Sequence, residues 1–323
     1  MTRAYQISKT GDSKVLKLSK VKLEEPKENE IRVKNRFVAV NHMDVHHRNG
    51  TYKMGKLPQT LGISGGGEII KVGAKVRDFK VGEKIVYGTC FIGSYSEEVN
   101  ISANLAIGLD SAISLEQAVA TIVPGLTAHY LIYGAYRVKK GNFVLVNGAT
   151  GSVGHILCQW LTSLGAEIIG AISNDAKAAQ AKNFGCRHVF NYKNKDFVKQ
   201  VTSLTKDAGV NVIYDCVGKA AFQNNIDTLS LLGLLVNYGD TSGLIDNFDV
   251  TKLWPKSLFY TRPNLSLYKG NRMELVLSAQ ALFENIKNKS IRPIYEVVDF
   301  AKIPEAHEKI ESGKIIGSII ARV

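Results

Sequence analysis

The stretch VNGATGSVGHI, residues 146–156, decides how the centre of this chain folds. It lies between an apolar run and a segment whose apolar residues recur at helical spacing. A glycine turn between a strand and a helix is typical of a loop that binds the pyrophosphate of a dinucleotide. Read as A-x-G-x-x-G, the turn has Ala149 at the first glycine position, followed by Gly151 and Gly154. A glycine turn that binds nothing is the alternative, and the surrounding pattern favours the binding loop.

Each position of this loop has an expected part in binding. Gly151 lets the backbone approach a pyrophosphate, and Gly154 lets the helix pack closely on the strand. The backbone N–H groups of Ser152 and Val153 begin the helix, where the dipole favours an anion.

Strands and helices alternate from Phe143 onward. Continuous apolar strands separated by amphipathic helices predict a parallel sheet covered on both faces. Six such strands predict the α/β class, with a doubly wound Rossmann domain. The expected strands cover residues 143–149, 167–173, 188–192, 210–218, 233–239 and 258–262.

The segments on either side of this domain have a different pattern. Before residue 115, short alternating runs broken by Gly, Asn and Asp predict a β-rich domain. Residues 114–133 predict a helix capped by Ser114, a break at Pro124-Gly125 and a second helix. We expect a first part of the β-rich domain at 1–122, an inserted nucleotide domain at 123–262 and a return segment at 263–323.

Composition excludes several classes of protein. The chain has 323 residues, 45% hydrophobic and 22% charged, which is ordinary globular composition. No apolar run suggests a membrane span, and the N-terminal segment has no signal-peptide core. The four cysteines form no CxxC pair, which favours reduced thiols and a cytoplasmic location. The net charge of +12 favours an anionic partner, but the basic residues are scattered and nucleic acid is not favoured.

The end of the second nucleotide-domain strand predicts which dinucleotide binds. NAD domains usually place a carboxylate there, on the ribose hydroxyl. This strand ends in Ile172 and Ser173, with Asn174 and Lys177 following, and these residues suit the 2′-phosphate of NADPH. Asp175 is the competing feature, because it could cap the next helix or face the ribose and favour NAD.

Eight motifs together resemble the quinone oxidoreductase branch of the medium-chain dehydrogenase/reductase superfamily, the zeta-crystallin-like enzymes. They are VAVNHMDVHHRNGTY (38–52), VPGLTAHYL (123–131), NGATGSVG (147–154), GAISNDAK (170–177), FNY (190–192), YDCVG (214–218), NYGDTSG (237–243) and FYTRP (259–263). The resemblance covers nearly the whole chain. It implies that the β-rich domain is GroES-like, and that the protein is a soluble homodimer that passes hydride from NADPH to a quinone or an activated alkene.

The resemblance also implies the site residues. Those expected to bind the cofactor are Asn41, His42, Asp44, Tyr130, Ala149, Gly151, Ser152, Val153, Gly154, Ser173, Asn174, Lys177, Tyr192, Val217, Gly239, Asp240, Thr241 and Ser242. Asn41 and Tyr52 are the catalytic candidates, expected to hydrogen-bond a carbonyl oxygen as charge builds on it. Relatives tend to carry an amide where Asp240 stands and an acid where Ser64 stands, so two positions depart from the branch.

We expect no metal. The positions that match the catalytic zinc ligands of related dehydrogenases hold Asn41, Ile63 and Pro124, which are poor zinc ligands. His42, His46 and His47 could gather around an ion, but no carboxylate or cysteine accompanies them at a familiar spacing.

Two other functions remain open. An NADPH-dependent enone or alkenal reductase would use the same cofactor and differ in the shape of its substrate cleft. A nucleotide- or RNA-binding protein without turnover would explain the high pI, but the intact cofactor motifs argue against it.

Overall fold

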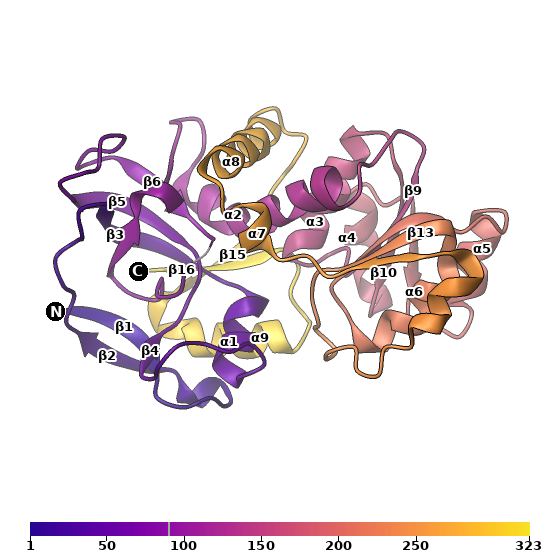
Figure 1. Cartoon of the computed structure of the whole chain (residues 1–323), viewed down its shortest axis with the longest axis horizontal. Coiled ribbons are helices and arrows are strands. Elements are labelled where there is room, and N and C mark those ends of the chain that lie inside the picture. Colours follow the sequence, from indigo (N-terminus) through magenta and orange to yellow (C-terminus); the bar gives the residue numbers. More distant parts are fainter. Residues whose placement is uncertain (90) are drawn as a thin grey trace. The chain divides into compact units, whose positions relative to one another are not determined.

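The computed structural model describes residues 1–89 and 91–323, whose helices and strands are labelled in Figure 1. These residues form two compact units. Unit 1 contains residues 1–126, 269–287 and 293–323. Unit 2 contains residues 127–268 and 288–292. The domain boundaries expected at 122/123 and 262/263 lie within six residues of the ends of the long segment of unit 2, residues 127–268.

Unit 2 is built on a six-stranded sheet with the order β11-β10-β9-β12-β13-β14. Every neighbouring pair in it is parallel, which confirms the predicted doubly wound sheet. The order reverses between β9 and β12, the switch point at which ligands bind in such sheets. The strands are β9 (Phe143–Asn147), β10 (Glu167–Ile172), β11 (His188–Asn191), β12 (Val210–Asp215), β13 (Leu229–Asn237) and β14 (Phe259–Thr261).

Helices cover both faces of this sheet. On one face, α5 and α6 pack through Phe197, Val201 and Ile226 against strand residues that include Ile169. A Cβ on Gly170 would point to the other face, because successive residues of a strand alternate, and there it would meet Cys186, three residues after the end of α4. The helices are α3 (Ser152–Ser163), α4 (Ala178–Asn183), α5 (Phe197–Leu204), α6 (Phe222–Thr228) and α7 (Leu265–Tyr268).

Unit 1 is β-rich, as predicted. Its larger sheet has the order β15-β16-β3-β5-β6-β8, with β7 also paired to β3, and a smaller sheet has the order β2-β1-β4. The strands are β1 (Thr2–Ile7), β2 (Lys17–Val21), β3 (Glu30–Val40), β4 (Gln59–Thr60), β5 (Gly65–Val72), β6 (Lys84–Tyr87), β7 (Glu98–Ser102), β8 (Ile107–Gly108), β15 (Tyr295–Asp299) and β16 (Ser318–Arg322). The helices α1 (His42–Asn49) and α9 (Ile303–Glu311) share a core with β1 and β3, and α8 spans Arg272–Lys287.

Helix α2 (Leu115–Tyr130) corrects one prediction. Ser114 caps it as expected, because its Oγ accepts a hydrogen bond of 3.2 Å from the backbone N of Gln117. The expected break at Pro124 is wrong, because the helix continues through it. A proline removes the bond to the carbonyl four residues earlier, here that of Ala120. The hydroxyl of Ser318 donates to this carbonyl at 2.9 Å, so the carbonyl stays paired.

The apolar run that contains α2 is also long enough to cross a membrane. It spans Leu115–Ala135, and 78% of its most apolar window is buried inside the protein. Burial of that extent is what the core helix of a globular protein shows.

The turn from β9 to α3 depends on two glycines. A Cβ on Gly154 would lie 2.1 Å from the carbonyl oxygen of Gly148, so the close packing predicted there is confirmed. Gly148 has φ +66°, the left-handed region that glycine tolerates best, and a Cβ on it would lie 2.6 Å from Cys216 Sγ. Gly151 has an extended backbone with φ −74°. The glycine that needs its conformational freedom is therefore Gly148, which the A-x-G-x-x-G reading left out.

We expect Gly154→Ala to destabilise the cofactor-free protein by about 1–3 kcal/mol or more, because the new methyl group overlaps backbone atoms. Gly151→Ala is the matched control, since its Cβ would meet only one atom, at 3.3 Å. Its free energy of unfolding should stay within about 1 kcal/mol of the parent. Urea unfolding measures both, and equal losses would contradict the packing described here.

Candidate active site

A buried carboxylate, Asp215, organises the carboxyl edge of the unit 2 sheet. It accepts hydrogen bonds from Asn147 Nδ2 at 2.9 Å, Val217 N at 2.9 Å, Gly218 N at 3.1 Å and Asn237 Nδ2 at 3.1 Å. Burial raises the pKa of Asp215, and these bonds act in the opposite direction. The ends of β9, β12 and β13 are thereby joined at the switch point.

Sequence reasoning missed this cluster, although a signal for it was present. Asn147, Asp215 and Asn237 are each the last residue of an otherwise apolar strand. Because the carboxyl ends of parallel strands meet at one edge, three polar last residues predict a polar contact there.

The amino end of α3 lies next to this cluster in the chain. Gly151 is its N-cap, and Ser152 and Val153 form the first turn, where backbone N–H groups have no acceptor within the helix. The helix has twelve residues, so its dipole is well developed. Ala149 is fully buried beneath the turn. An anion such as a pyrophosphate is what such a helix end can bind, and the predicted pyrophosphate site stays a prediction.

The residues expected around the 2′-phosphate follow β10. Asn174 caps a 3-10 turn, Asp175–Lys177, by accepting a hydrogen bond of 3.0 Å from Ala176 N. Partial burial lowers the pKa of Lys177. Tyr192, whose backbone N donates to Ile172 O at 3.0 Å, is partly buried, and this raises the pKa of its hydroxyl; a hydrogen bond with the side chain of Ser173 acts in the opposite direction.

Asp175 was the competing feature at this point. The expectation that Asp175 caps the next helix is wrong, because Asn174 is the capping residue. The Asp175 carboxylate instead accepts a hydrogen bond of 3.2 Å from Asn191 Nδ2 at the end of β11.

The loop at 239–242 packs against the loop that follows β12. Ser242 donates from Oγ to Val217 O at 2.6 Å and accepts at Oγ from Ala220 N at 2.9 Å. Thr241 N donates to Cys216 O at 3.0 Å. A Cβ on Gly239 would lie 3.3 Å from that same oxygen. The hydroxyl of Ser242 therefore holds the two loops together.

Asp240 forms an ion pair that sequence reasoning missed. Its carboxylate receives Arg262 Nη1 at 2.7 Å and Arg262 Nη2 at 2.5 Å, and Arg262 Nη1 also donates to Asn237 Oδ1 at 2.5 Å. Asp240 is buried, whereas 39% of the Arg262 side chain is exposed. The motif FYTRP contains Arg262, but no sequence pattern pairs it with Asp240. Asp240 thus neutralises a cation of its own unit.

Tyr130, another expected cofactor residue, is buried in unit 2. Its ring stacks on that of Tyr268, with centroids 4.7 Å apart and an interplanar angle of 17°.

The unit 1 candidates lie at the start of α1. Asn41 is the N-cap, and its backbone N donates to Asp44 Oδ2 at 2.8 Å. Its side-chain Nδ2 donates to Asp44 Oδ2 at 3.2 Å and to Ser64 Oγ at 3.2 Å. Asp44 is completely buried, and burial raises its pKa to about 7. Both N–H groups of the Asn41 amide are in use, so the donor role expected of Asn41 is not available.

The histidines of α1 lie close to these residues. Burial and the neighbouring His46 lower the pKa of His42 to about 4. The Tyr52 ring lies 4.8 Å from that of His46, and Tyr52 N donates to His46 O at 3.0 Å. Over residues 1–89 and 91–323, no three His, Cys, Asp or Glu side chains come together as metal ligands.

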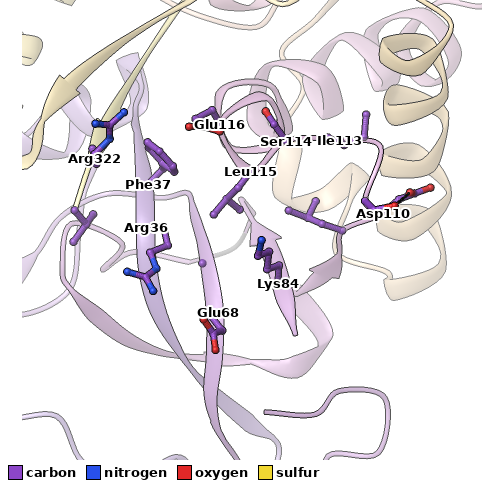
Figure 2. Close-up of a pocket in the computed structure, with 14 residues that line it drawn as sticks. Arg36, Phe37, Glu68, Lys84, Asp110, Ile113, Ser114, Leu115, Glu116 and Arg322 are labelled. Carbon is purple, nitrogen blue, oxygen red and sulfur yellow. Dashed lines mark hydrogen bonds between the residues drawn. The ribbon is translucent and has the colours of Figure 1, made fainter. Parts of the chain in front are cut away.

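A separate pocket in unit 1 contains none of the predicted site residues. Figure 2 shows Arg36, Arg322 and Lys84 together with Glu68 and Glu116 around it. Its volume is about 710 Å³, and Phe37, Ile113 and Leu115 add apolar surface. Because acidic and basic side chains both line this pocket, it does not have the charge expected of a site for an anionic dinucleotide.

The six-stranded sheet, its glycine turn and the polar residues at its carboxyl edge define a dinucleotide-dependent dehydrogenase or reductase. The alcohol dehydrogenase GroES-like domain profile matches residues 27–142, and the zinc-binding dehydrogenase profile matches residues 152–264.

Relatives match over the full length. Quinone oxidoreductase 1 of Escherichia coli K12 is 36% identical over 98% of each chain, and a 2-haloacrylate reductase of Burkholderia is 33% identical over 99% of this chain and 98% of its own. The crystal structure of E. coli quinone oxidoreductase complexed with NADPH superimposes with a TM-score of 0.97 at 34% identity, over 99% of this chain and 100% of that one. The chain therefore belongs to the quinone oxidoreductase family of the medium-chain dehydrogenase/reductase superfamily.

We expect Arg262→Met to destabilise the protein by about 1–3 kcal/mol, because it leaves the buried Asp240 carboxylate without its cation. The partial exposure of Arg262 keeps the loss below that of a fully buried pair. The double variant Asp240→Asn/Arg262→Met should recover most of it. Lys219→Met, which breaks the exposed pair with Asp246, should change the free energy of unfolding by less than about 1 kcal/mol. A double variant as unstable as Arg262→Met would show that the pair is not the cause.

Proposed function

We propose that this protein is an NADPH-dependent quinone reductase that needs no zinc. The observation that carries the proposal is the end of β10, where Ser173, Asn174 and the half-buried Lys177 stand without a carboxylate on the last strand residue, Ile172. The named activity of the full-length relatives and the NADPH complex of one of them support it.

The described residues fit the cofactor that this function requires. Side chains on Gly148 and Gly154 would overlap Cys216 Sγ and the carbonyl oxygen of Gly148, so the tight β9–α3 turn that presents the amino end of α3 needs both glycines. Ser152 and Val153 would hold the pyrophosphate through backbone N–H groups. Ser173, Asn174, Lys177 and Tyr192 would surround the 2′-phosphate. When bound, NADPH supplies the hydride.

The remaining predicted residues would act nearer the reacting atoms. Val217, Gly239 and Thr241 would border the nicotinamide through loop backbone, since Ser242 and Asp240 are engaged within their own unit. Tyr52 would donate a hydrogen bond to the oxygen of the acceptor, where negative charge develops during hydride transfer. His42 and Tyr130 would contribute neutral surface.

Loss of NADPH absorbance with a simple benzoquinone tests the proposal. We expect turnover with the quinone and weaker turnover with a matched panel of enones and alkenals. The relative named 2-haloacrylate reductase motivates the second candidate, a reductase of activated C=C bonds. A preference for the enones would favour that candidate, and NADPH binding without turnover of either would favour a non-catalytic nucleotide- or RNA-binding protein.

The choice of cofactor depends on Lys177. Its charge-assisted bond to a phosphate contributes about 1.5–3 kcal/mol, which corresponds to about one to two decades of NADPH preference. We expect Lys177→Ala to lower kcat/KM with NADPH by that factor and to leave the value with NADH nearly unchanged. Lys182→Ala, on the following helix, is the control. Equal losses with both cofactors would mean that Lys177 supports the fold or the pyrophosphate.

We also propose that the protein is a soluble, cytoplasmic homodimer joined through the outer strand of the unit 2 sheet. Strand β14 is the last strand of that sheet, and Phe259 on it is 59% exposed. On β13, Leu231 and Leu232 are 70% and 61% exposed. An uncovered apolar edge invites pairing with another chain.

Light scattering should report a dimer at micromolar concentration, and Phe259→Lys should shift the population towards monomer. Leu267→Lys, at an exposed leucine of α7, is the control and should remain dimeric. A parent protein that is monomeric at this concentration would contradict the proposal.

A further inference from the structure

A chain of buried polar side chains runs through unit 1 and ends at Asn41. Arg48 Nη1 lies 3.5 Å from His307 Nδ1. His307 Nε2 lies 3.0 Å from the hydroxyl of Tyr95, which lies 3.0 Å from Asp44 Oδ2. All four side chains are almost completely buried. Neither Tyr95 nor His307 has a part in the chemistry described so far.

Arg48 can only donate, and this fixes which side chain donates in each of the hydrogen bonds from Arg48 to Asp44. A guanidinium has five donors and no acceptor, so His307 Nδ1 must accept. Burial and Arg48 lower the pKa of His307 to about 3, and the ring is therefore neutral at physiological pH. A neutral ring that accepts at Nδ1 carries its proton on Nε2 and donates it to the Tyr95 oxygen. The Tyr95 proton is then left to donate to Asp44.

The side-chain amide of Asn41, at the end of this series of hydrogen bonds, is held in one orientation as a result. An ionised carboxylate only accepts, so Asp44 requires the N–H side of the Asn41 amide. One N–H of Asn41 faces Asp44 and the other faces Ser64, as described above. The remaining atom of this side chain is its carbonyl oxygen, Oδ1, which faces the Asp44 backbone N–H in the capping box of α1 and keeps a second lone pair for a further donor. Asn41 is partly exposed, so a ligand can reach it.

We infer that this directed chain sets Asn41 as a hydrogen-bond acceptor for a hydroxyl group in the active site, and that Tyr95 and His307 are positioning residues. The inference rests on the proposed function. Two hydroxyl groups fit it, namely a ribose hydroxyl on the nicotinamide side of the cofactor and the hydroxyl of the reduced acceptor. A carbonyl acceptor such as an unreduced quinone offers no proton to Oδ1 and would gain nothing from it.

The arrangement depends on pH, because it needs Asp44 ionised. Burial raises the pKa of this carboxyl to about 7, and the bonds from Asn41 and Tyr95 hold it from rising further. Above about pH 7 the carboxylate keeps the Asn41 amide in place. Below it, a protonated Asp44 can donate, and the amide is free to reverse.

Other titratable and charged side chains lie near these hydrogen-bonded residues, and their contribution to any pH dependence must be distinguished from that of Asp44. His42 and His46 lie on α1, and Glu311 on α9 pairs with Arg48 at 2.6 Å. The low pKa values of His42 and His307 keep both rings neutral between pH 5 and 9. Asp44→Asn removes the carboxyl and leaves these groups unchanged, so any pH dependence that survives in it belongs to them.

The test measures two quantities that need no turnover. Infrared difference spectra of the cofactor-free protein follow the Asp44 carboxyl, identified as the band that Asp44→Asn removes. Fluorescence titration gives the Kd of NADPH and of a hydroquinone against pH. Loss of a bond to a charged group should raise the Asp44 midpoint by about one to two pH units in Tyr95→Phe. His307→Gln, whose amide can still donate to Tyr95, should stay near the parent.

Tyr87→Phe is the matched control, because it removes another buried hydroxyl of unit 1, one that donates to Asn35 Oδ1 at 2.9 Å. It should lose stability without moving the Asp44 midpoint.

A Kd for NADPH that weakens as Asp44 protonates would identify the ribose hydroxyl, and a Kd for the hydroquinone that weakens alone would identify the reduced acceptor. An unmoved midpoint in Tyr95→Phe, or both Kd values independent of Asp44 ionisation, would overturn the inference. Because neither readout needs hydride transfer, a failed quinone assay would not be mistaken for either result.

Discussion

The carboxylate of Asp215 is the constraint on which the rest of unit 2 depends. A parallel sheet leaves its carboxyl edge as loose loops unless something joins them, and here one buried anion receives two side-chain amides and two backbone N–H groups. A buried charge is costly unless it is fully hydrogen-bonded, so the loops have little freedom to move away from it. The carboxylate holds Val217 directly, and the 239–242 loop is attached to Val217 in turn through the Ser242 hydroxyl.

Much of the fold could be predicted because it depends on local sequence patterns. The six strands of unit 2 and the cap at Ser114 each depend on residues that are neighbours in the sequence. The continuous helix through Pro124 could not be predicted, because the bond that keeps Ala120 paired comes from Ser318, far along the chain. The same limit applies to the candidate site. Gly154 and Lys177 belong to recognisable motifs, whereas the Asp240–Arg262 pair and the Tyr95–His307 contact join distant segments.

The two buried carboxylates of the candidate site residues behave differently for a physical reason. Asp240 accepts a bidentate pair of hydrogen bonds from the guanidinium of Arg262. Asp44 has only neutral donors, and its environment leaves the carboxyl close to balance near neutral pH. Protonation of Asp44 near neutral pH therefore changes the hydrogen bond between this carboxyl and the Asn41 amide.

The carboxylate at position 240 also changes how charge is distributed for cofactor recognition. An amide at this position would bond to Arg262 and leave its positive charge unbalanced beside the loop at 239–242. Asp240 cancels that charge within 2.7 Å, so the guanidinium contributes little long-range attraction for a phosphate. Under the function proposed above, the amino end of α3 and Lys177 would then supply the attraction for an anionic cofactor. The choice between NADPH and NADH would in that case depend more strongly on Lys177.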